Sequence, residues 1–171
     1  PNVPVSCSTP VPKVMTIAPR TDVARMRQAR WTGPFTVDDL LDLCSSGSRF
    51  APPEKGAVYV VSVAKWSRRP DQGCQPLYVG STTGKGPRFR TRIGDLIADL
   101  FGFYTTRTGH HSGGQSLHQW CRENGKNPRH LYIGWVETEC VRCEECRLYS
   151  TLRPLRNRKR PARCRVHPKK S

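Results

Sequence analysis

Acidic residues are scarce in this chain of 171 residues, which has 13 Asp and Glu against 29 Lys and Arg and a formal net charge of +16. The shortage is greatest at the C-terminal end, because no acidic residue follows Glu145. Such an excess of positive charge makes nucleic acid, or another polyanion, the leading class of partner.

Long apolar runs are also missing. No stretch approaches the roughly 20 apolar residues that a membrane span requires, so the sequence excludes an integral membrane protein. The first residues lack a basic segment followed by an apolar one, so we expect no signal peptide.

The hydrophobic fraction of 36% is low for a tightly packed globule but too high for a disordered chain. No internal repeat is visible in the sequence. We therefore expect one modest domain with long loops or tails.

Eight cysteines are scattered along the chain, and the only dense group is Cys140-x2-Cys143-x2-Cys146. We expect reduced thiols in an intracellular protein, cytoplasmic or nuclear, rather than a disulfide network. A structural zinc ion generally needs four ligands, and positions at intervals of three fan along a helix. Cys121 or Cys164 would have to complete such a site. A buried row of thiols that packs the helix is the favoured interpretation, and zinc is the alternative.

Residues 1–55 are predicted to form an N-terminal extension. A Pro-rich lead over residues 1–20 is followed by a short helix over Thr21–Trp31, where apolar residues recur at helical intervals. Thr36 is a good capping residue for a second short helix over residues 37–43, which carries acidic side chains in its first turn.

From residue 56 the pattern alternates between runs rich in β-branched residues and amphipathic segments. The predicted elements are strands over 57–63, 77–80 and 131–136 and helices over 90–101, 116–124 and 140–152. Their order, strand–strand–helix–helix–strand–helix, predicts an α+β fold with a small antiparallel three-stranded sheet flanked by helices. This predicted domain covers residues 56–157, and residues 158–171 form a basic tail.

Several short motifs lie on these predicted elements in a defined order. They are Val58-Tyr59-Val60 on the first strand, Tyr78-Val79-Gly80-Ser81 on the second, an Arg on the next helix, His111-Ser112-Gly113-Gly114 before the following helix, and Glu145 with Asn157 on and after the last one. This ordered set resembles the GIY-YIG nuclease family, in the form found in homing and restriction endonucleases. Each residue alone has an ordinary interpretation, such as a core tyrosine or a surface charge, and the joint order carries the hypothesis.

The first motif departs from the family pattern, because Ala57-Val58-Tyr59 stands in place of Gly-Ile-Tyr. Many members carry a His one helical turn after the catalytic Arg, and this position is Leu96 here. An imidazole contribution would therefore have to come from His110 or His111.

The catalytic arginine is ambiguous among Arg88, Arg90 and Arg92, because residues 84–87 form an insertion before the helix. We choose Arg92, since an Ile and further apolar residues follow it in helical register.

The resemblance implies a metal-dependent endonuclease that hydrolyses phosphodiester bonds. Glu145 would hold one divalent cation, Mg²⁺ or Mn²⁺, which acts as a Lewis acid on the scissile phosphate. Arg92 would donate its forked hydrogen bonds to non-bridging oxygens, a geometry that Lys lacks. Tyr59 would position or deprotonate the attacking water, although a phenol with a pKa near 10 is a poor base at neutral pH.

The remaining residues would have supporting roles. Tyr78 would hydrogen-bond the water or the phosphate, His111 would contribute its imidazole, and Asn157 would brace the helix of Glu145 through backbone contacts. The expected substrate is double-stranded DNA, with no role for a membrane. The candidate DNA-binding side chains are Arg88, Arg90, Arg156, Arg158, Lys159 and Arg160.

Two other classes of function remain open from the sequence. One is a basic DNA- or RNA-binding module without catalysis, with or without a stabilising zinc ion. The other is a ribosomal or zinc-ribbon-like RNA-binding protein, for which stoichiometric zinc would be the distinguishing property.

Overall fold

The computed structural model describes residues 30–45, 56–82, 86–103 and 111–162. Its elements in chain order are β1 (Trp31–Thr36), α1 (Val37–Ser45), β2 (Ala57–Ser62), the 3-10 helix η1 (Gln72–Cys74), β3 (Pro76–Thr82), α2 (Gly86–Leu100), α3 (Ser112–Glu123), the 3-10 helix η2 (Pro128–His130), β4 (Tyr132–Glu137) and α4 (Val141–Leu152). The predicted α+β class is confirmed.

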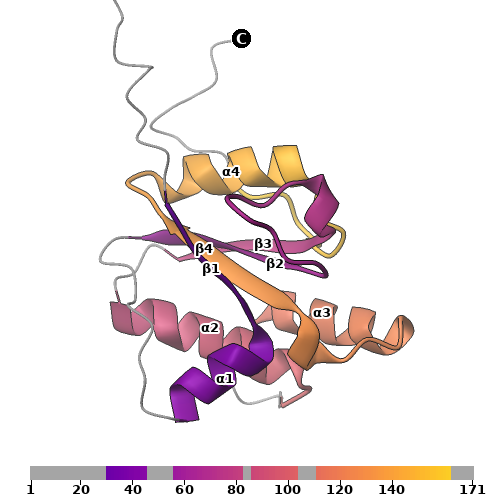
Figure 1. Cartoon of the computed structure of the whole chain (residues 1–171). Helices are drawn as coiled ribbons and strands as arrows, with labels where there is room; N and C mark the ends of the chain where they lie inside the picture. The colour runs from indigo at the N-terminus through magenta and orange to yellow at the C-terminus, as the bar shows by residue number, and fades with distance from the viewer. Residues whose placement is uncertain (1–29, 46–55, 83–85, 104–110, 163–171) are drawn as a thin grey trace, which may run out of the picture.

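The sheet has four antiparallel strands in the order β1-β4-β2-β3, as Figure 1 shows. The prediction of three strands is therefore wrong by one. The additional strand, β1, comes from the segment assigned to the N-terminal extension, and it pairs with β4 through a register irregularity between Thr32 and Phe35. Gly33 and Pro34 lie at this irregularity. They interrupt the alternation of apolar and polar residues by which a strand is recognised in a sequence. Proline is tolerated here because β1 is an edge strand.

The predicted helix over Thr21–Trp31 is not supported at its end, because Trp31 begins β1. Residues 21–29 lie outside the described part of the chain. The second predicted helix is confirmed as α1, and its cap is a reciprocal pair. Thr36 Oγ1 accepts a hydrogen bond from the Asp39 backbone N–H, and Asp39 Oδ2 accepts one from the Thr36 N–H, both at 2.9 Å.

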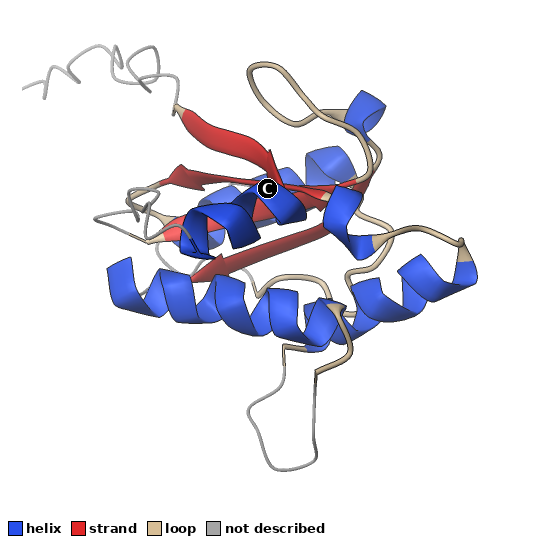
Figure 2. Ribbon diagram, turned by 60° about the horizontal axis from the view of Figure 1, so that its bottom comes forward, coloured by secondary structure: helices blue, strands red, loops and turns tan. Residues whose placement is uncertain are grey.

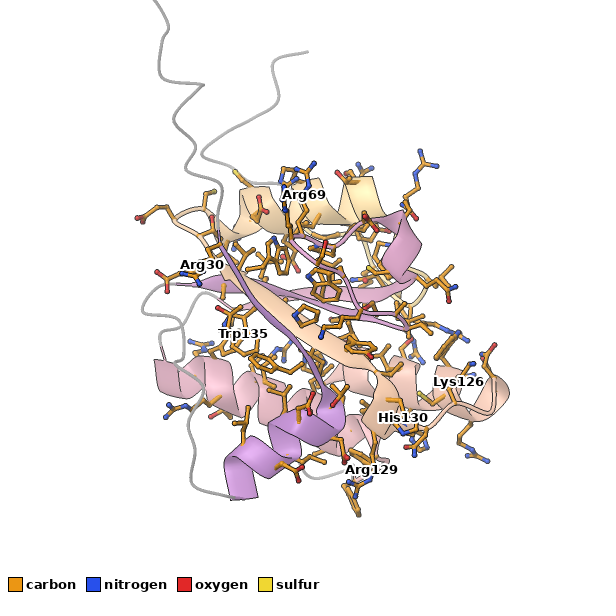
Figure 3. All side chains as sticks on the ribbon, in the orientation of Figure 1. Arg30, Arg69, Lys126, Arg129, His130 and Trp135 are labelled. Atoms are coloured by element: carbon orange, nitrogen blue, oxygen red, sulfur yellow. The ribbon has the colours of Figure 1, made fainter. Side chains whose placement is uncertain are left out.

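The molecule has three layers, with α1, α2 and α3 on one face of the sheet and α4 on the other (Figure 2). β2 is buried along its whole length and divides its side chains between the two faces. Tyr59 and Val61 point toward α1–α3, whereas Val58 and Val60 point toward α4. Trp135 of β4, labelled in Figure 3, packs on Phe89 of α2 with ring centroids 5.2 Å apart, in the core between the sheet and α1–α3.

The outer edge of β3 is covered by the chain that follows α4. The Arg156 N–H donates to the Leu77 carbonyl at 2.7 Å, and the Asn157 side chain continues this pairing. From Pro76 to Val79 this edge is therefore closed to a strand from another chain. Among the described helices, none is both long enough and apolar enough to cross a membrane.

Candidate active site

Tyr59 lies at the centre of the candidate site, in the middle of β2. Its side chain is fully buried, and Gly80 stands directly opposite it on β3. A Cβ atom at Gly80 would collide with the Tyr59 hydroxyl and would lie 2.7 Å from the Tyr78 ring. The glycine therefore lets the Tyr59 side chain cross β3 and carry its hydroxyl toward the edge of the sheet.

Tyr78 lies beside Tyr59, with the two ring centroids 6.2 Å apart. A Cβ atom at Gly113, in the first turn of α3, would collide with the Tyr78 ring. The first turn of α3, Ser112-Gly113-Gly114, thus provides the space in which Tyr78 packs. The structure brings both predicted tyrosines together with the predicted histidine loop.

His111 is fully buried and caps α3, and its two ring nitrogens have different partners. Nδ1 accepts a hydrogen bond from the Gly114 backbone N–H at 3.2 Å. Nε2 lies 2.6 Å from the Tyr59 hydroxyl oxygen. Because Nδ1 acts as an acceptor, the single ring proton of the neutral imidazole is on Nε2. His111 therefore donates to Tyr59, and the other predicted candidate, His110, lies outside the described residues.

Arg92 is the second group that affects the pKa of the Tyr59 hydroxyl. Burial raises the pKa of Tyr59 well above its usual value and Tyr78 raises it further, whereas the charge of Arg92 and its hydrogen bond to Tyr59 oppose the rise. Burial also raises the pKa of Tyr78, again against the charge of Arg92. Tyr59 is thus a protonated phenol whose oxygen faces two donors, His111 and Arg92. Both donors favour the phenolate over the phenol.

Asp99 is a buried carboxylate that the sequence analysis did not identify. Its Oδ2 accepts a hydrogen bond from the His111 backbone N–H at 2.8 Å and another from Gln115 at 3.4 Å. It thereby ties the start of α3, and with it the imidazole, to α2. The available signal was an acidic residue between Leu96 and Leu100, on a helix whose other buried positions are apolar.

Glu145 approaches the same edge of the sheet from α4, on the opposite face. Its Oε2 accepts a hydrogen bond from the Ser81 hydroxyl at 2.9 Å, a partner that the sequence analysis missed. The neighbouring Glu144 pairs instead with Arg147 of its own helix. Glu145, and not Glu144, is the carboxylate that faces β3.

Glu145 has the properties of a ligand for a hard cation. Burial raises the pKa of its carboxyl group, while the Ser81 hydroxyl and the charges of Arg92 and Arg142 lower it. Its charge also acts on both Tyr59 and Tyr78, so the carboxylate and the phenols share one electrostatic environment. Mg²⁺ is commonly held by one or two carboxylates together with water and substrate phosphates, which this arrangement fits. Within the described ranges, no three His, Cys, Asp or Glu side chains form a group able to hold a metal.

The Asn157 side chain forms two hydrogen bonds with the backbone of β3. Its Oδ1 accepts from the Val79 N–H at 2.8 Å and its Nδ2 donates to the Val79 carbonyl at 2.7 Å. These two hydrogen bonds have the pattern that a neighbouring strand would form. They hold the chain after α4 against β3 at Val79, between Tyr78 and Gly80. This contact agrees with the bracing role that the resemblance implies.

The predicted DNA-binding residues differ in their contacts and in their exposure to solvent. Arg156 forms an ion pair with Glu123 of α3. Arg158 lines an open cleft of about 470 Å³ together with α3 side chains that include Arg122 and His118. The other four residues of this set are at least partly exposed: Arg88, Arg90, Lys159 and Arg160.

Comparison of the chain with family models, curated proteins and solved structures gave no match.

The burial of His111 gives a testable pH dependence of stability. Burial lowers the pKa of His111 to about 4, with the charge of Arg92 acting in the same direction. The groups around the imidazole are Tyr59, Tyr78, Arg92 and Asp99. The unfolded chain binds a proton at this histidine with a pKa near 6.5, whereas the folded chain does so only near pH 4. The free energy of unfolding is therefore at its full value above about pH 6.5 and decreases as the pH falls toward 4.

The measurement is urea unfolding of wild type and of His111→Asn between pH 4 and 7. Asn can still cap α3, but it does not titrate. We expect the free energy of unfolding of the wild type to fall by up to about 3 kcal/mol more than that of the variant over this range. A matched change at the exposed His130 is the control. Equal pH dependence in wild type and His111→Asn would contradict the burial of a neutral imidazole.

Proposed function

We propose that this chain is a divalent-metal-dependent endonuclease of the GIY-YIG type, which hydrolyses phosphodiester bonds of double-stranded DNA. The observation that carries the proposal is the meeting of five side chains from five different elements at the covered edge of β3. Tyr59, Tyr78, Arg92 and His111 reach it from the face of α2 and α3, and Glu145 reaches it from α4.

The phenol of Tyr59 is the group that contacts the attacking water in this proposal. With His111 and Arg92 donating to its oxygen, its own O–H is directed to a third partner, a water or phosphate oxygen. For Tyr59 to act as a base, its own O–H proton first leaves to solvent; the resulting phenolate, which the same two donors stabilise, then takes a proton from the attacking water. His111 is therefore a donor to the tyrosine and not the general base.

Arg92 also supplies a fork of N–H groups to the non-bridging phosphoryl oxygens, where negative charge increases in the transition state. Glu145 would hold the cation, which when bound supplies Lewis-acid stabilisation of the phosphoryl group and of the leaving oxygen. Asp99 and Asn157 hold the imidazole and the edge strand in place.

DNA binding is proposed to depend on the basic side chains next to the site. Arg158 follows Asn157 directly and lines the cleft along α3, and Lys159 and Arg160 continue the basic run. Phosphate contacts by such side chains position a duplex without reading its sequence.

The test uses a labelled DNA duplex and an RNA duplex of the same sequence, each incubated with the purified chain. Cleavage of the DNA in Mg²⁺ or Mn²⁺, and none in EDTA, is the expected result. Cleavage of the RNA alone would contradict the substrate class. Cleavage in EDTA at the rate seen in Mg²⁺ would contradict the role of Glu145.

Changing Arg158, Lys159 and Arg160 together to Gln should flatten the salt dependence of DNA binding. Each phosphate contact on duplex DNA adds about 0.9 to the magnitude of the slope of log affinity against log salt, so losing three contacts lowers it by about 2 to 3. Binding is measured at several salt concentrations for both proteins. The cleavage rate at saturating DNA should change little. An unchanged slope would place the DNA on another surface, and Arg88 and Arg90 would be tested next.

A further inference from the structure

The cleft of about 470 Å³ beside α3 is formed by one face of that helix and by the chain that follows α4. Four of its side chains recur at intervals of three and four residues, so they lie along one face of α3: Gln115, His118, Gln119 and Arg122. Arg158 reaches the cleft from the chain that follows α4. Two elements far apart in the sequence thus enclose one polar cleft.

Contacts of Arg156 hold these two elements together. The Ser116 hydroxyl donates to the Arg156 carbonyl at 3.1 Å, and the Arg156 guanidinium forms an ion pair with Glu123. The side chain of Asn157 fixes the next residue of the same segment to β3. Because residues 156 and 157 are both anchored, Arg158 extends into the cleft from a backbone that is held in place.

The lining of the cleft has an excess of positive charge. Glu123, the acidic side chain in the lining, is paired with Arg156 and accepts a hydrogen bond from Gln119 at 2.8 Å. Arg122 and Arg158 are exposed, and neither forms an ion pair with an acidic residue that the structure describes. Two guanidinium groups are therefore open to an anionic ligand, and their forked donors fit the oxygens of a phosphate.

One end of the cleft adjoins the candidate active site. The Gln115 side chain donates to Asp99 Oδ2 at 3.4 Å, and the same oxygen accepts from the backbone N–H of His111. From Gln115 to Arg122 the helix rises by about 10 Å. Phosphates of one DNA strand follow each other about every 3.4 Å along the duplex axis, so this length corresponds to about three phosphates.

We propose that this cleft binds the DNA backbone beside the scissile phosphate, over about three nucleotides of one strand, with Arg122 and Arg158 contacting the phosphate oxygens. Such contacts fix the position of a duplex on the site without reading its sequence. The inference rests on the proposed function for the identity of the polyanion, but it does not require cleavage, because its readout is binding. It adds Arg122 to the DNA-binding residues.

The test measures binding of a labelled DNA duplex to the full-length chain in EDTA at several salt concentrations. In Arg122→Gln we expect the slope of log affinity against log salt to fall in magnitude by about 0.9, the value of one phosphate contact on duplex DNA. In Arg122→Gln combined with Arg158→Gln we expect a fall of about 1.8. Both side chains are exposed, so the melting temperature should stay unchanged.

Arg69→Gln is the matched control. Arg69 is an exposed arginine that Figure 3 shows beside α4, across the sheet from α3, so its loss should leave the slope unchanged.

Equal slopes in the wild type, Arg122→Gln and the double variant would overturn the inference, even if the chain cleaves DNA. An equal fall in Arg69→Gln would also overturn it, because the slope would then report net charge only. A fall seen with an RNA duplex and not with DNA would overturn the assigned ligand. A chain that cleaves no DNA, yet shows the expected falls, would refute the proposed nuclease function and support the cleft as a DNA-binding surface.

Discussion

Replacing Glu145 by Gln should abolish DNA cleavage and leave DNA affinity nearly unchanged. Gln has the same size and can keep the hydrogen bond with Ser81, but it lacks the charge that holds a divalent cation. We expect the rate in Mg²⁺ to fall on the order of 10³-fold or more, because stabilisation of the phosphoryl oxygens and the leaving oxygen is lost. The measurement is single-turnover cleavage of a labelled duplex, with affinity measured separately.

Glu144→Gln is the matched control for this change. Glu144 is the adjacent carboxylate of α4 and is paired with Arg147, so its loss should leave cleavage close to the wild-type rate. Near-normal cleavage by Glu145→Gln, or equal loss in both variants, would remove Glu145 from the site.

Tyr59→Phe should reduce the cleavage rate by about 10² to 10⁴-fold, the range typical of general acid–base groups. The change keeps the buried ring and deletes only the hydroxyl that faces His111 and Arg92. Because His111 Nε2–H then loses its buried acceptor, we also expect a loss of stability of about 1 to 3 kcal/mol. The protein should still fold, since the packing against Phe89 and Tyr78 is retained.

The control is Tyr132→Phe on β4, which removes a phenol from the same sheet outside the candidate site. It should change the cleavage rate little. A Tyr59→Phe protein that is as active as the wild type would show that the hydroxyl is a packing feature only.

The strands and helices from residue 56 onward were predictable because their signals are local. β2 is rich in valine and carries a tyrosine, and α2 shows apolar residues at helical spacing. The cap at Thr36 was predictable for the same reason, since its partner Asp39 is only three residues away. β1 was missed because Gly33 and Pro34 interrupt its alternation, and only pairing with the distant β4 reveals it as a strand.

The candidate site was predictable in its residue types but not in its geometry. Motif order pointed to Tyr59 and Glu145, yet Ser81 became a partner of Glu145 only when α4 packed over β3. Likewise, the proton position on His111 follows from the Gly114 N–H contact. Asp99 stands out in the sequence only as an acidic residue among apolar helix positions, and its partner, the backbone of another helix, is not encoded in a side-chain pattern.

The most direct test of the central claim is the fate of a supercoiled plasmid incubated with the purified wild-type chain. Five side chains at one edge of β3 are proposed to hydrolyse DNA with a divalent cation held at Glu145. We predict that nicked and then linear plasmid appears in Mg²⁺ or Mn²⁺, and that the plasmid stays supercoiled in EDTA. A folded protein that binds the plasmid but leaves it supercoiled at every concentration of either cation would contradict the claim.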